Sequence, residues 1–278
     1  MPARDPQAGT DPMSSADAAR SRPDYGIDAP YVIRNLFLAA ALGFGLWGVR
    51  VLTPWSGDVV IPVASTTLVF PIVRMGQGIG ASCLILGVWM LWDSRVGKVR
   101  RCKRLLNLIR WSGSEQVLDV GCGRGLMMIE AAKRLTSGKA TGIDSWKDED
   151  LSGNRLEAAL ENARREGVFE RVEIRTADMR SLPFDDDAFD VVVSRAAIHN
   201  LYQVTERARA ISEIARVVKP GGHVLIEDIR HRPEYTAVLA TKGFAQIERV
   251  DSPVIAWFCK ILSSGSLQLG TILARKQQ

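Results

Sequence analysis

The segment Val117–Gly125 constrains the fold of this chain more than any other feature. It reads VLDVGCGRG, in which apolar residues surround Asp119 and glycine then recurs at every second position. The apolar part predicts a short buried strand. The glycines predict a tight turn in which the backbone can approach a ligand with no Cβ in the way. The run Leu126–Leu135 then predicts a helix, whose N-terminus directs N–H groups and the positive end of the helix dipole toward whatever lies over the turn.

Strand-like and helix-like runs alternate along the chain from residue 113 onward. The predicted strands are Gln116–Val120, Lys139–Asp144, Arg171–Thr176, Phe189–Ser194, His223–Asp228, Gln246–Val250 and Leu267–Ala274, and further helices are predicted at Asn154–Glu166 and Thr205–Val218. Strands separated by helices of this length form βαβ units with a parallel sheet. We therefore expect an α/β fold, with a Rossmann-like, mostly parallel, seven-stranded sheet and helices on both faces.

Two apolar runs precede this region, at Tyr31–Leu52 and Met75–Trp92. Each approaches the ~20 residues that a helix needs to cross a bilayer, and tryptophans stand near their ends, as in interfacial aromatic belts. A basic block follows the second run, and short positive flanks stay in the cytoplasm. The sequence thus predicts a transmembrane helical hairpin over 31–92, in the plasma or inner membrane, with both chain ends and the downstream domain cytoplasmic. A signal peptide, or two buried helices of a soluble domain, are the alternatives.

Charge is concentrated in one place. Seven Lys or Arg residues and one Asp lie between Asp93 and Arg110, so this block accounts for the net charge of +5. The remainder has no basic excess, which argues against a nucleic-acid partner. Within 93–112 a juxtamembrane helix is predicted, and its apolar residues could face either anionic lipid or the next domain; they are Cys102, Leu105, Leu106 and Ile109.

The remaining organisation follows from composition. Residues 1–30 are rich in Pro, Ala, Ser, Asp and Arg and are predicted to be disordered. The expected divisions are therefore a tail at 1–30, the hairpin at 31–92, the basic helix at 93–112 and a folded domain at 113–278. The four cysteines are far apart with no C-x-x-C pair, so no metal site is expected.

The domain at 113–278 resembles class I S-adenosylmethionine (SAM)-dependent methyltransferases of the small-molecule type. The glycine turn, an acidic residue ending the second strand, Asp178-Met179 after the third, and Lys219-Pro220-Gly221-Gly222 before the fifth occur in the family's order. The resemblance implies SAM as cofactor, with the turn and Asp119 against its methionine part and Asp178 at the adenine. Asp144 can accept both ribose hydroxyls. The cofactor set is Asp119, Gly121, Cys122, Gly123, Gly125, Asp144, Ser145, Asp178, Met179 and Ser194.

Candidates for the methyl acceptor follow the fourth and fifth strands, because ligands in such sheets bind beyond the carboxyl ends of the strands. His199 could act as a general base or be a histidine packed beside the cofactor. The substrate-binding set is His199, Asn200, Asp228, Arg230, His231 and Tyr235, and solvated loop positions are the alternative for the last four.

The function expected is a membrane-anchored methyltransferase that acts on a small-molecule or lipid-like acceptor at the cytoplasmic face. A catalytically inactive SAM-binding scaffold is one alternative. A nicotinamide-dependent oxidoreductase is the other, and Leu126 weighs against it because the dinucleotide fingerprint has a third glycine there. The loop after Asp144 is long for the family, and Trp146 within it could cover the base. Oligomeric state cannot be read from the sequence.

Overall fold

The computed structural model describes residues 22–147, 151–250 and 270–278. These residues form two compact units. The first holds the residues up to Asp24, then Cys102–Trp146 and Arg155–Gln278, and the second holds Tyr25–Arg101 and Lys147–Asn154. The predicted disorder of residues 1–21, the cysteine at 259 and the first residues of the last predicted strand lie outside the described residues.

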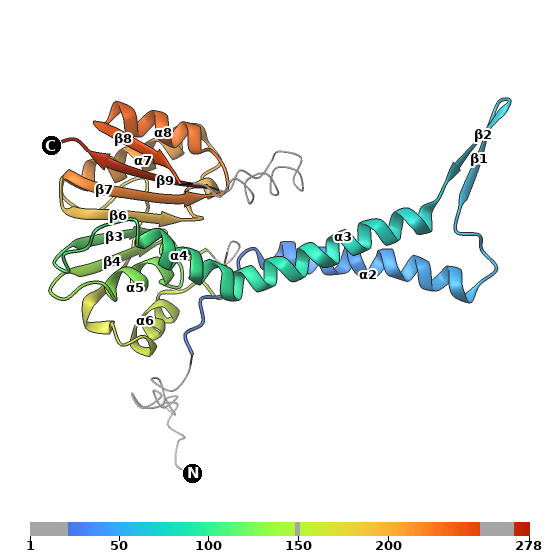
Figure 1. The fold of residues 1–278 in the computed structure, drawn as a ribbon, viewed down its shortest axis with the longest axis horizontal. Coiled ribbons are helices and arrows are strands. Elements are labelled where there is room, and N and C mark those ends of the chain that lie inside the picture. Colours follow the sequence, from blue (N-terminus) through green and yellow to red (C-terminus); the bar gives the residue numbers. More distant parts are fainter. Residues whose placement is uncertain (1–21, 148–150, 251–269) are drawn as a thin grey trace, which may run out of the picture. The chain divides into compact units, whose positions relative to one another are not determined.

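A seven-stranded sheet forms the centre of the first unit, in the order β5-β4-β3-β6-β7-β9-β8 (Figure 1). Its strands are β3 Gln116–Val120, β4 Lys139–Asp144, β5 Val172–Thr176, β6 Phe189–Arg195, β7 Val218–Asp228, β8 Phe244–Arg249 and β9 Gly270–Lys276. The first five are parallel, and β9 runs antiparallel between β7 and β8. The prediction of a mostly parallel α/β sheet is thus confirmed.

Strand order gives this sheet a switch point between β3 and β6. From β3 the chain proceeds to β4 and β5 on one side, and then returns to β6 and β7 on the other. Crevices in open α/β sheets form where the strand order reverses, outside the carboxyl ends of the strands. The turn after β3 and the turn after β6 therefore border one crevice.

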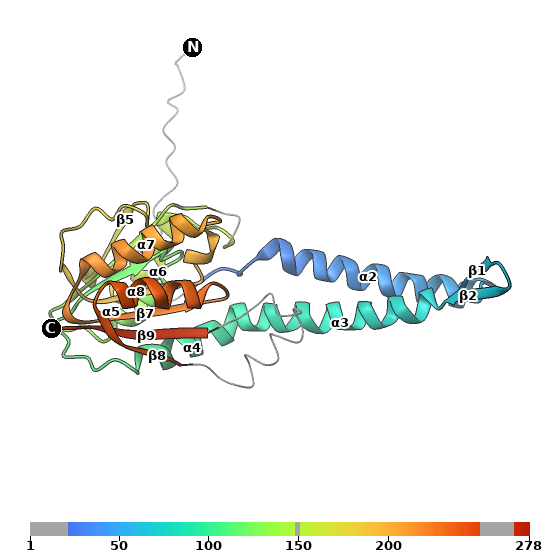
Figure 2. The same ribbon diagram turned by 90° about the horizontal axis from the view of Figure 1, so that it is seen from above.

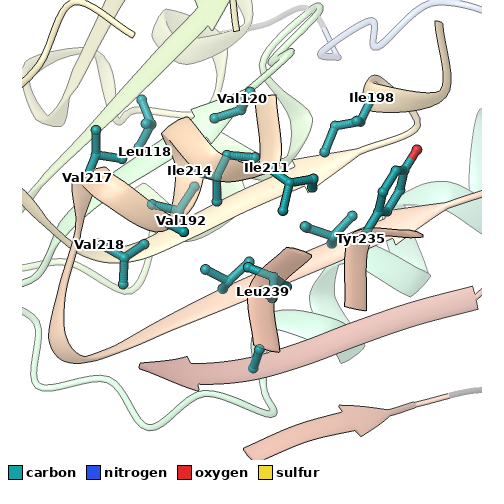
Figure 3. Packing of buried hydrophobic residues seen from close by; sticks show 14 of the residues in the cluster. Leu118, Val120, Val192, Ile198, Ile211, Ile214, Val217, Val218, Tyr235 and Leu239 are labelled. Carbon is teal, nitrogen blue, oxygen red and sulfur yellow. The ribbon is translucent and has the colours of Figure 1, made fainter. Parts of the chain in front are cut away.

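Side chains of β3 alternate between the two faces of the sheet. Leu118 and Val120 join a buried cluster with α7 (Val204–Val217) and α8 (Arg232–Thr241), shown in Figure 3. Asp119 points to the other face, where it meets α5 (Leu126–Ala132). The remaining elements of this unit are α5 Leu126–Ala132, α6 Leu156–Arg165 and the short turns Phe169–Arg171 and Ile198–Asn200. The sequence did not predict α8, which begins four residues after β7 ends.

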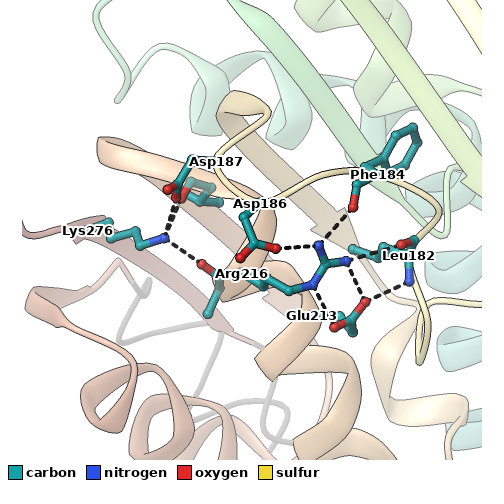
Figure 4. A network of polar contacts seen from close by, with 9 residues as sticks. Leu182, Phe184, Asp186, Asp187, Glu213, Arg216 and Lys276 are labelled. Carbon is teal, nitrogen blue, oxygen red and sulfur yellow. Dashed lines mark hydrogen bonds and ion pairs between the residues drawn. The ribbon is translucent and has the colours of Figure 1, made fainter.

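A polar network fastens the amino end of β6 to the end of α7 (Figure 4). The Arg216 guanidinium donates to Glu213, to Asp186 and to the carbonyl oxygens of Leu182 and Phe184. Its planar fork suits such a multidentate arrangement. The network lies at the edge of the sheet opposite the crevice, so it stabilises the fold at a distance from the site.

The basic helix α4 (Lys98–Leu106) turns its apolar residues inward. Cys102 and Leu106 are completely buried, and Leu105 and Ile109 are nearly so. The Arg134 side chain donates to Asn107 Oδ1 over 2.7 Å and so fixes the residues that follow α4. Of the two alternatives left open by the sequence, this apolar face serves the folded unit and not lipid.

In the second unit, α2 (Pro30–Leu52) and α3 (Ile72–Trp92) lie side by side in both views (Figures 1 and 2). A Cβ on Gly43 would overlap the carbonyl oxygen of Gly76, so the two backbones approach closely. By length and composition, α2 and the helical stretch Ile72–Leu106 that begins with α3 could each cross a membrane, and only 17% and 11% of their apolar windows are buried. The loop between them contains a β-hairpin, β1 (Val59–Val63) with β2 (Thr66–Phe70), that the sequence did not predict.

The residues next to these helices are also held in place. The Lys98 ammonium is almost fully buried and donates to the carbonyl oxygens of Tyr25 and Gly26 and to the Asp28 carboxylate. These partners satisfy all three of its N–H donors, which a buried ammonium requires. The chain just before α2 is therefore attached to the chain just after α3.

Candidate functional site

The glycine turn after β3 has the backbone geometry that its sequence predicts. Gly121, Gly123 and Gly125 have φ angles of 75°, 53° and 85°, a region that side-chain-bearing residues rarely adopt. A Cβ on Gly121 would also overlap the Cβ of Ala197, which follows β6. The turn after β3 and the turn after β6 are thus in contact, and only glycine permits this approach.

Three N–H groups of the turn are engaged with the neighbouring strand β4. Those of Gly121 and Cys122 both donate to the carbonyl oxygen of Ile143 over 2.9 Å, and that of Gly123 donates to Asp144 Oδ2 over 2.8 Å. These three groups attach the turn to the end of β4 and are not presented to a ligand. What the turn offers instead is a close backbone approach and a carboxylate held beside it.

Asp119 lies buried beneath the turn, with 1% of its surface exposed. Its Oδ2 accepts the Met128 N–H of α5 over 2.9 Å, whereas its Oδ1 is buried and has no hydrogen-bond partner among the described residues. Burial raises the pKa of Asp119 to about 7, and the charge of Asp144 adds to this rise, against the Met128 hydrogen bond. A buried acceptor without a partner suits a cationic or hydrogen-donating ligand group.

We expect Asp119 to make stability depend on pH. Because the pKa of Asp119 in the folded protein lies above the ordinary value, the protonated carboxyl stabilises the folded state. This contribution to the free energy of unfolding is complete below about pH 4 and is lost as the pH rises to about 7. At about 1.4 kcal/mol per pKa unit, the loss is at most ~4 kcal/mol. The measurement is the thermal unfolding midpoint of the ligand-free wild type and of Asp119→Asn from pH 4.5 to 8. As the pH rises, the midpoint of the wild type should fall relative to that of the variant. Parallel profiles would contradict this assignment.

The predicted adenine-side residues follow β4 and β5. Asp178 is exposed, and its carboxylate pairs with Arg180 at 2.6 Å, which holds the pKa of Asp178 below its ordinary value. Met179 lies next to the turn, with its Cε 3.7 Å from the position of a Cβ on Gly121. The Trp146 indole N–H donates to Thr176 Oγ1 over 2.8 Å. Ser145 is exposed.

Ser194 was predicted to lie in the cofactor site, and in the structure its hydroxyl is bonded within the sheet. It is buried, and its hydroxyl donates to the carbonyl oxygen of Val120 over 2.8 Å. This bond joins the carboxyl ends of β6 and β3, the two strands at the switch point. Ser194 therefore supports the crevice from within the sheet.

His199 forms a dyad with Asp228, which ends the neighbouring strand β7. Its Nδ1 lies 2.5 Å from Asp228 Oδ1, and its backbone N–H donates to Asp228 Oδ2 over 3.0 Å. An ionised carboxylate only accepts, so we assign the Nδ1 proton to the histidine. This assignment leaves Nε2 as the acceptor nitrogen of a ring whose side chain is 18% exposed.

Asp228 itself is enclosed behind the histidine. It also accepts from the Ile229 N–H over 2.8 Å and from the Tyr235 hydroxyl over 3.1 Å. Tyr235 is fully buried on α8, where burial and then the charge of Asp228 raise its pKa, so the hydroxyl remains a donor. Asp228 and Tyr235 were predicted to bind the acceptor; in the structure both are buried, Asp228 contacts the His199 ring and Tyr235 donates to Asp228.

The other predicted acceptor residues are dispersed. Asn200 follows His199 and is half-buried. Arg230 is exposed, and His231 pairs through Nδ1 with Glu234 at 3.0 Å. No hydrogen bond among the described residues joins Arg230 or His231 to His199.

Sequence reasoning missed two features of this site. The pairing of His199 with Asp228 could have been found, because both residues follow neighbouring strands at the same edge of the sheet. The contribution of Asn162, a polar residue of α6 that touches the turn, carried no sequence signal. Among the described residues, no group of His, Cys, Asp and Glu side chains has a metal-binding arrangement.

The chain is similar in sequence to known methyltransferases. The methyltransferase domain family matches residues 117–222. Methyltransferase GfsG of Streptomyces halstedii is 31% identical over 61% of this chain and 53% of its own length. Phosphatidylethanolamine N-methyltransferase of Cereibacter sphaeroides is 32% identical over 58% of this chain and 73% of its own length.

Among solved structures, geranyl diphosphate C-methyltransferase from Streptomyces coelicolor, determined with S-adenosyl-L-homocysteine, shares the fold with a TM-score of 0.51 at 18% identity. That likeness covers 68% of this chain and 82% of the other. The chain spans about half the length, or less, of the first curated relatives that it matches.

Proposed function

We propose a function from the premise that this chain belongs to the SAM-dependent methyltransferase family: it binds SAM over the glycine turn and transfers the methyl group to a small-molecule or lipid-like acceptor. When bound, SAM supplies an activated methyl group on a sulfonium. The observation that carries the proposal is the unpartnered, buried Oδ1 of Asp119 beneath a turn that only glycine can form, at the switch point of the sheet.

The residues around the turn fit the chemical groups of SAM. Asp119 offers an acceptor to the ammonium of the methionine part. Asp144 ends β4 beside the turn and accepts the N–H groups of Gly123 and Trp146. A carboxylate at the end of this strand suits the two hydroxyls of the ribose. Met179 provides an apolar surface on the adenine side of Gly121.

His199 fits the role of general base. Asp228 holds the ring through Nδ1, so Nε2 can take a proton from the acceptor as the methyl group is transferred. This arrangement selects acceptors that have a proton to lose, such as a hydroxyl, an amine or an acidic C–H. Alignment of donor and acceptor supplies the remainder of the rate enhancement.

A membrane location and a lipid-like acceptor belong to the same proposal. They are supported by the two largely unburied apolar helices, by the basic block after the second of them and by the relative named for phosphatidylethanolamine. A catalytic unit anchored at the cytoplasmic face of a membrane would meet apolar acceptors at high local concentration.

The proposal is tested by incubating the full-length protein in membranes with methyl-labelled SAM, extracting with organic solvent and identifying the labelled product. We expect label in the lipid-soluble fraction with the wild type and none with Asp144→Ala. Titration calorimetry on the same preparations reports SAM binding separately. Binding without label in any extract would support an inactive SAM-binding scaffold, and label confined to water-soluble or protein fractions would overturn the acceptor class.

A further inference from the structure

We propose that Asn162 is a positioning residue that fastens the segment Arg22–Asp24 to the glycine turn, so that SAM affinity depends on chain that precedes the first apolar helix. This inference rests on the proposed function, because it concerns the same cofactor site. It adds a structural element that the methyltransferase-like region alone does not contain, since Asp24 lies 97 positions before Gly121, the first glycine of the turn.

The Asn162 amide is buried on α6, with 1% of its surface exposed. Its Oδ1 accepts the Asp24 N–H over 2.9 Å. Its Nδ2 donates to the carbonyl oxygen of Asp24 over 2.8 Å and to the carbonyl oxygen of Arg124 over 2.9 Å. One side chain therefore pairs with both backbone groups of Asp24 and at the same time holds the turn between Gly123 and Gly125.

Two further contacts support the same segment. The Arg124 guanidinium pairs with the Asp24 carboxylate at 3.0 Å, and Arg165 donates to the carbonyl oxygen of Arg22 over 3.1 Å. The Asp24 carboxylate is 59% exposed, so this ion pair contributes little by itself. The buried amide of Asn162 matters more, because its removal leaves backbone groups without their partners.

The position of this contact explains its expected effect on the cofactor. The N–H groups of Gly121, Cys122 and Gly123 attach one side of the turn to β4. The Arg124 carbonyl is attached on the other side, through Asn162, to α6. A turn rich in glycine has high conformational freedom. A second attachment restricts the turn before SAM binds, so less conformational entropy is lost on binding. Without Asn162, the turn has to become ordered when SAM binds, and the affinity for SAM is lower.

The test replaces Asn162 with leucine, which has the same number and branching of side-chain heavy atoms and no hydrogen-bonding groups. We expect KM and Kd for SAM to rise roughly tenfold, with kcat at saturating SAM within about twofold of the wild type. Hydrogen exchange of the peptide that contains Asp24 should become faster in the SAM-free protein. Glu157→Gln is the matched control, since Glu157 is an exposed carboxylate on the same helix, and it should leave SAM affinity unchanged.

Deletion provides a second route that leaves α6 intact. Removing residues 1–24 should raise Kd for SAM to a similar extent, whereas removing residues 1–21 should not. In the chain that lacks residues 1–24, Asn162→Leu should raise Kd for SAM by much less than it does in the full chain. Unchanged Kd or unchanged exchange at Asp24 in a folded Asn162→Leu protein, or fully additive effects, would overturn the inference alone. A wild type that binds no SAM would overturn the proposed function and this inference together.

Discussion

Replacing His199 with alanine is expected to lower kcat by roughly 10²- to 10⁴-fold, the usual contribution of a positioned general base. Its Nε2 is the only ring nitrogen left for the acceptor proton, because Nδ1 is engaged with Asp228 at 2.5 Å. SAM affinity should change little, since no hydrogen bond joins His199 to the glycine turn among the described residues. Initial rates with labelled SAM, together with calorimetric Kd values, measure both quantities.

Substitutions of Asp228 and Tyr235 distinguish a role of His199 in proton transfer from a role in packing. Asp228→Asn retains the shape but offers an N–H donor, which favours the tautomer with the proton on Nε2, so kcat should fall nearly as far as in His199→Ala. Tyr235→Phe removes one of four hydrogen bonds to Asp228 and keeps the carboxylate, so kcat should fall less than tenfold. If His199→Ala retains most of its activity, the histidine is a packed residue beside the cofactor and the acceptor needs no base.

Replacing Gly121 with alanine is expected to weaken SAM binding strongly. The added Cβ overlaps Ala197, and residue 121 has a φ of 75°. Overpacking and backbone strain each cost about 1–3 kcal/mol. Together these costs correspond to a loss of affinity of roughly 30-fold or more. Titration calorimetry with SAM measures the loss.

The chain offers both a rescue and a control for this variant. Ala197→Gly removes the Cβ that Gly121→Ala would meet, so the double variant should recover the part of the loss that comes from the overlap. Gly167→Ala introduces similar strain, at a φ of 67°, where no atom lies within 4 Å of the new Cβ, and it should leave SAM affinity unchanged. A Gly121→Ala protein with wild-type affinity would show that the two turns are not pressed together.

Local sequence was sufficient to predict most of the sheet. The strands Gln116–Val120 and Lys139–Asp144 were predicted to the residue, because each is an apolar run bounded by polar or turn-forming residues, and these signals depend only on near neighbours. The glycine turn was predictable for the same reason: its positive φ angles are a property of glycine itself. Likewise, the two apolar helices follow from run length.

Contacts between distant segments were not predictable in this way. The sequence analysis predicted no strands between the apolar helices, where the structure has a β-hairpin. The pairing of β1 with β2 depends on their register and not on local propensity alone. Helix α8 carried a weak periodic signal and is stabilised by packing against α7, β8 and β9. Its formation moved Tyr235 from an expected binding loop into the core.

The amino-acid sequence by itself determined the order of strands and helices, the glycine turn and the acidic residue that ends the second strand, because these features depend on backbone preference and hydrophobic period. Only the tertiary structure decided how the polar groups are paired. It directed the N–H groups of the turn to β4, enclosed Asp228 behind His199 and brought Asn162 between Asp24 and Arg124. A hydrogen bond depends on where two groups meet in space, and residues as far apart in the chain as Asp24 and Asn162, 138 positions, meet only in the folded protein.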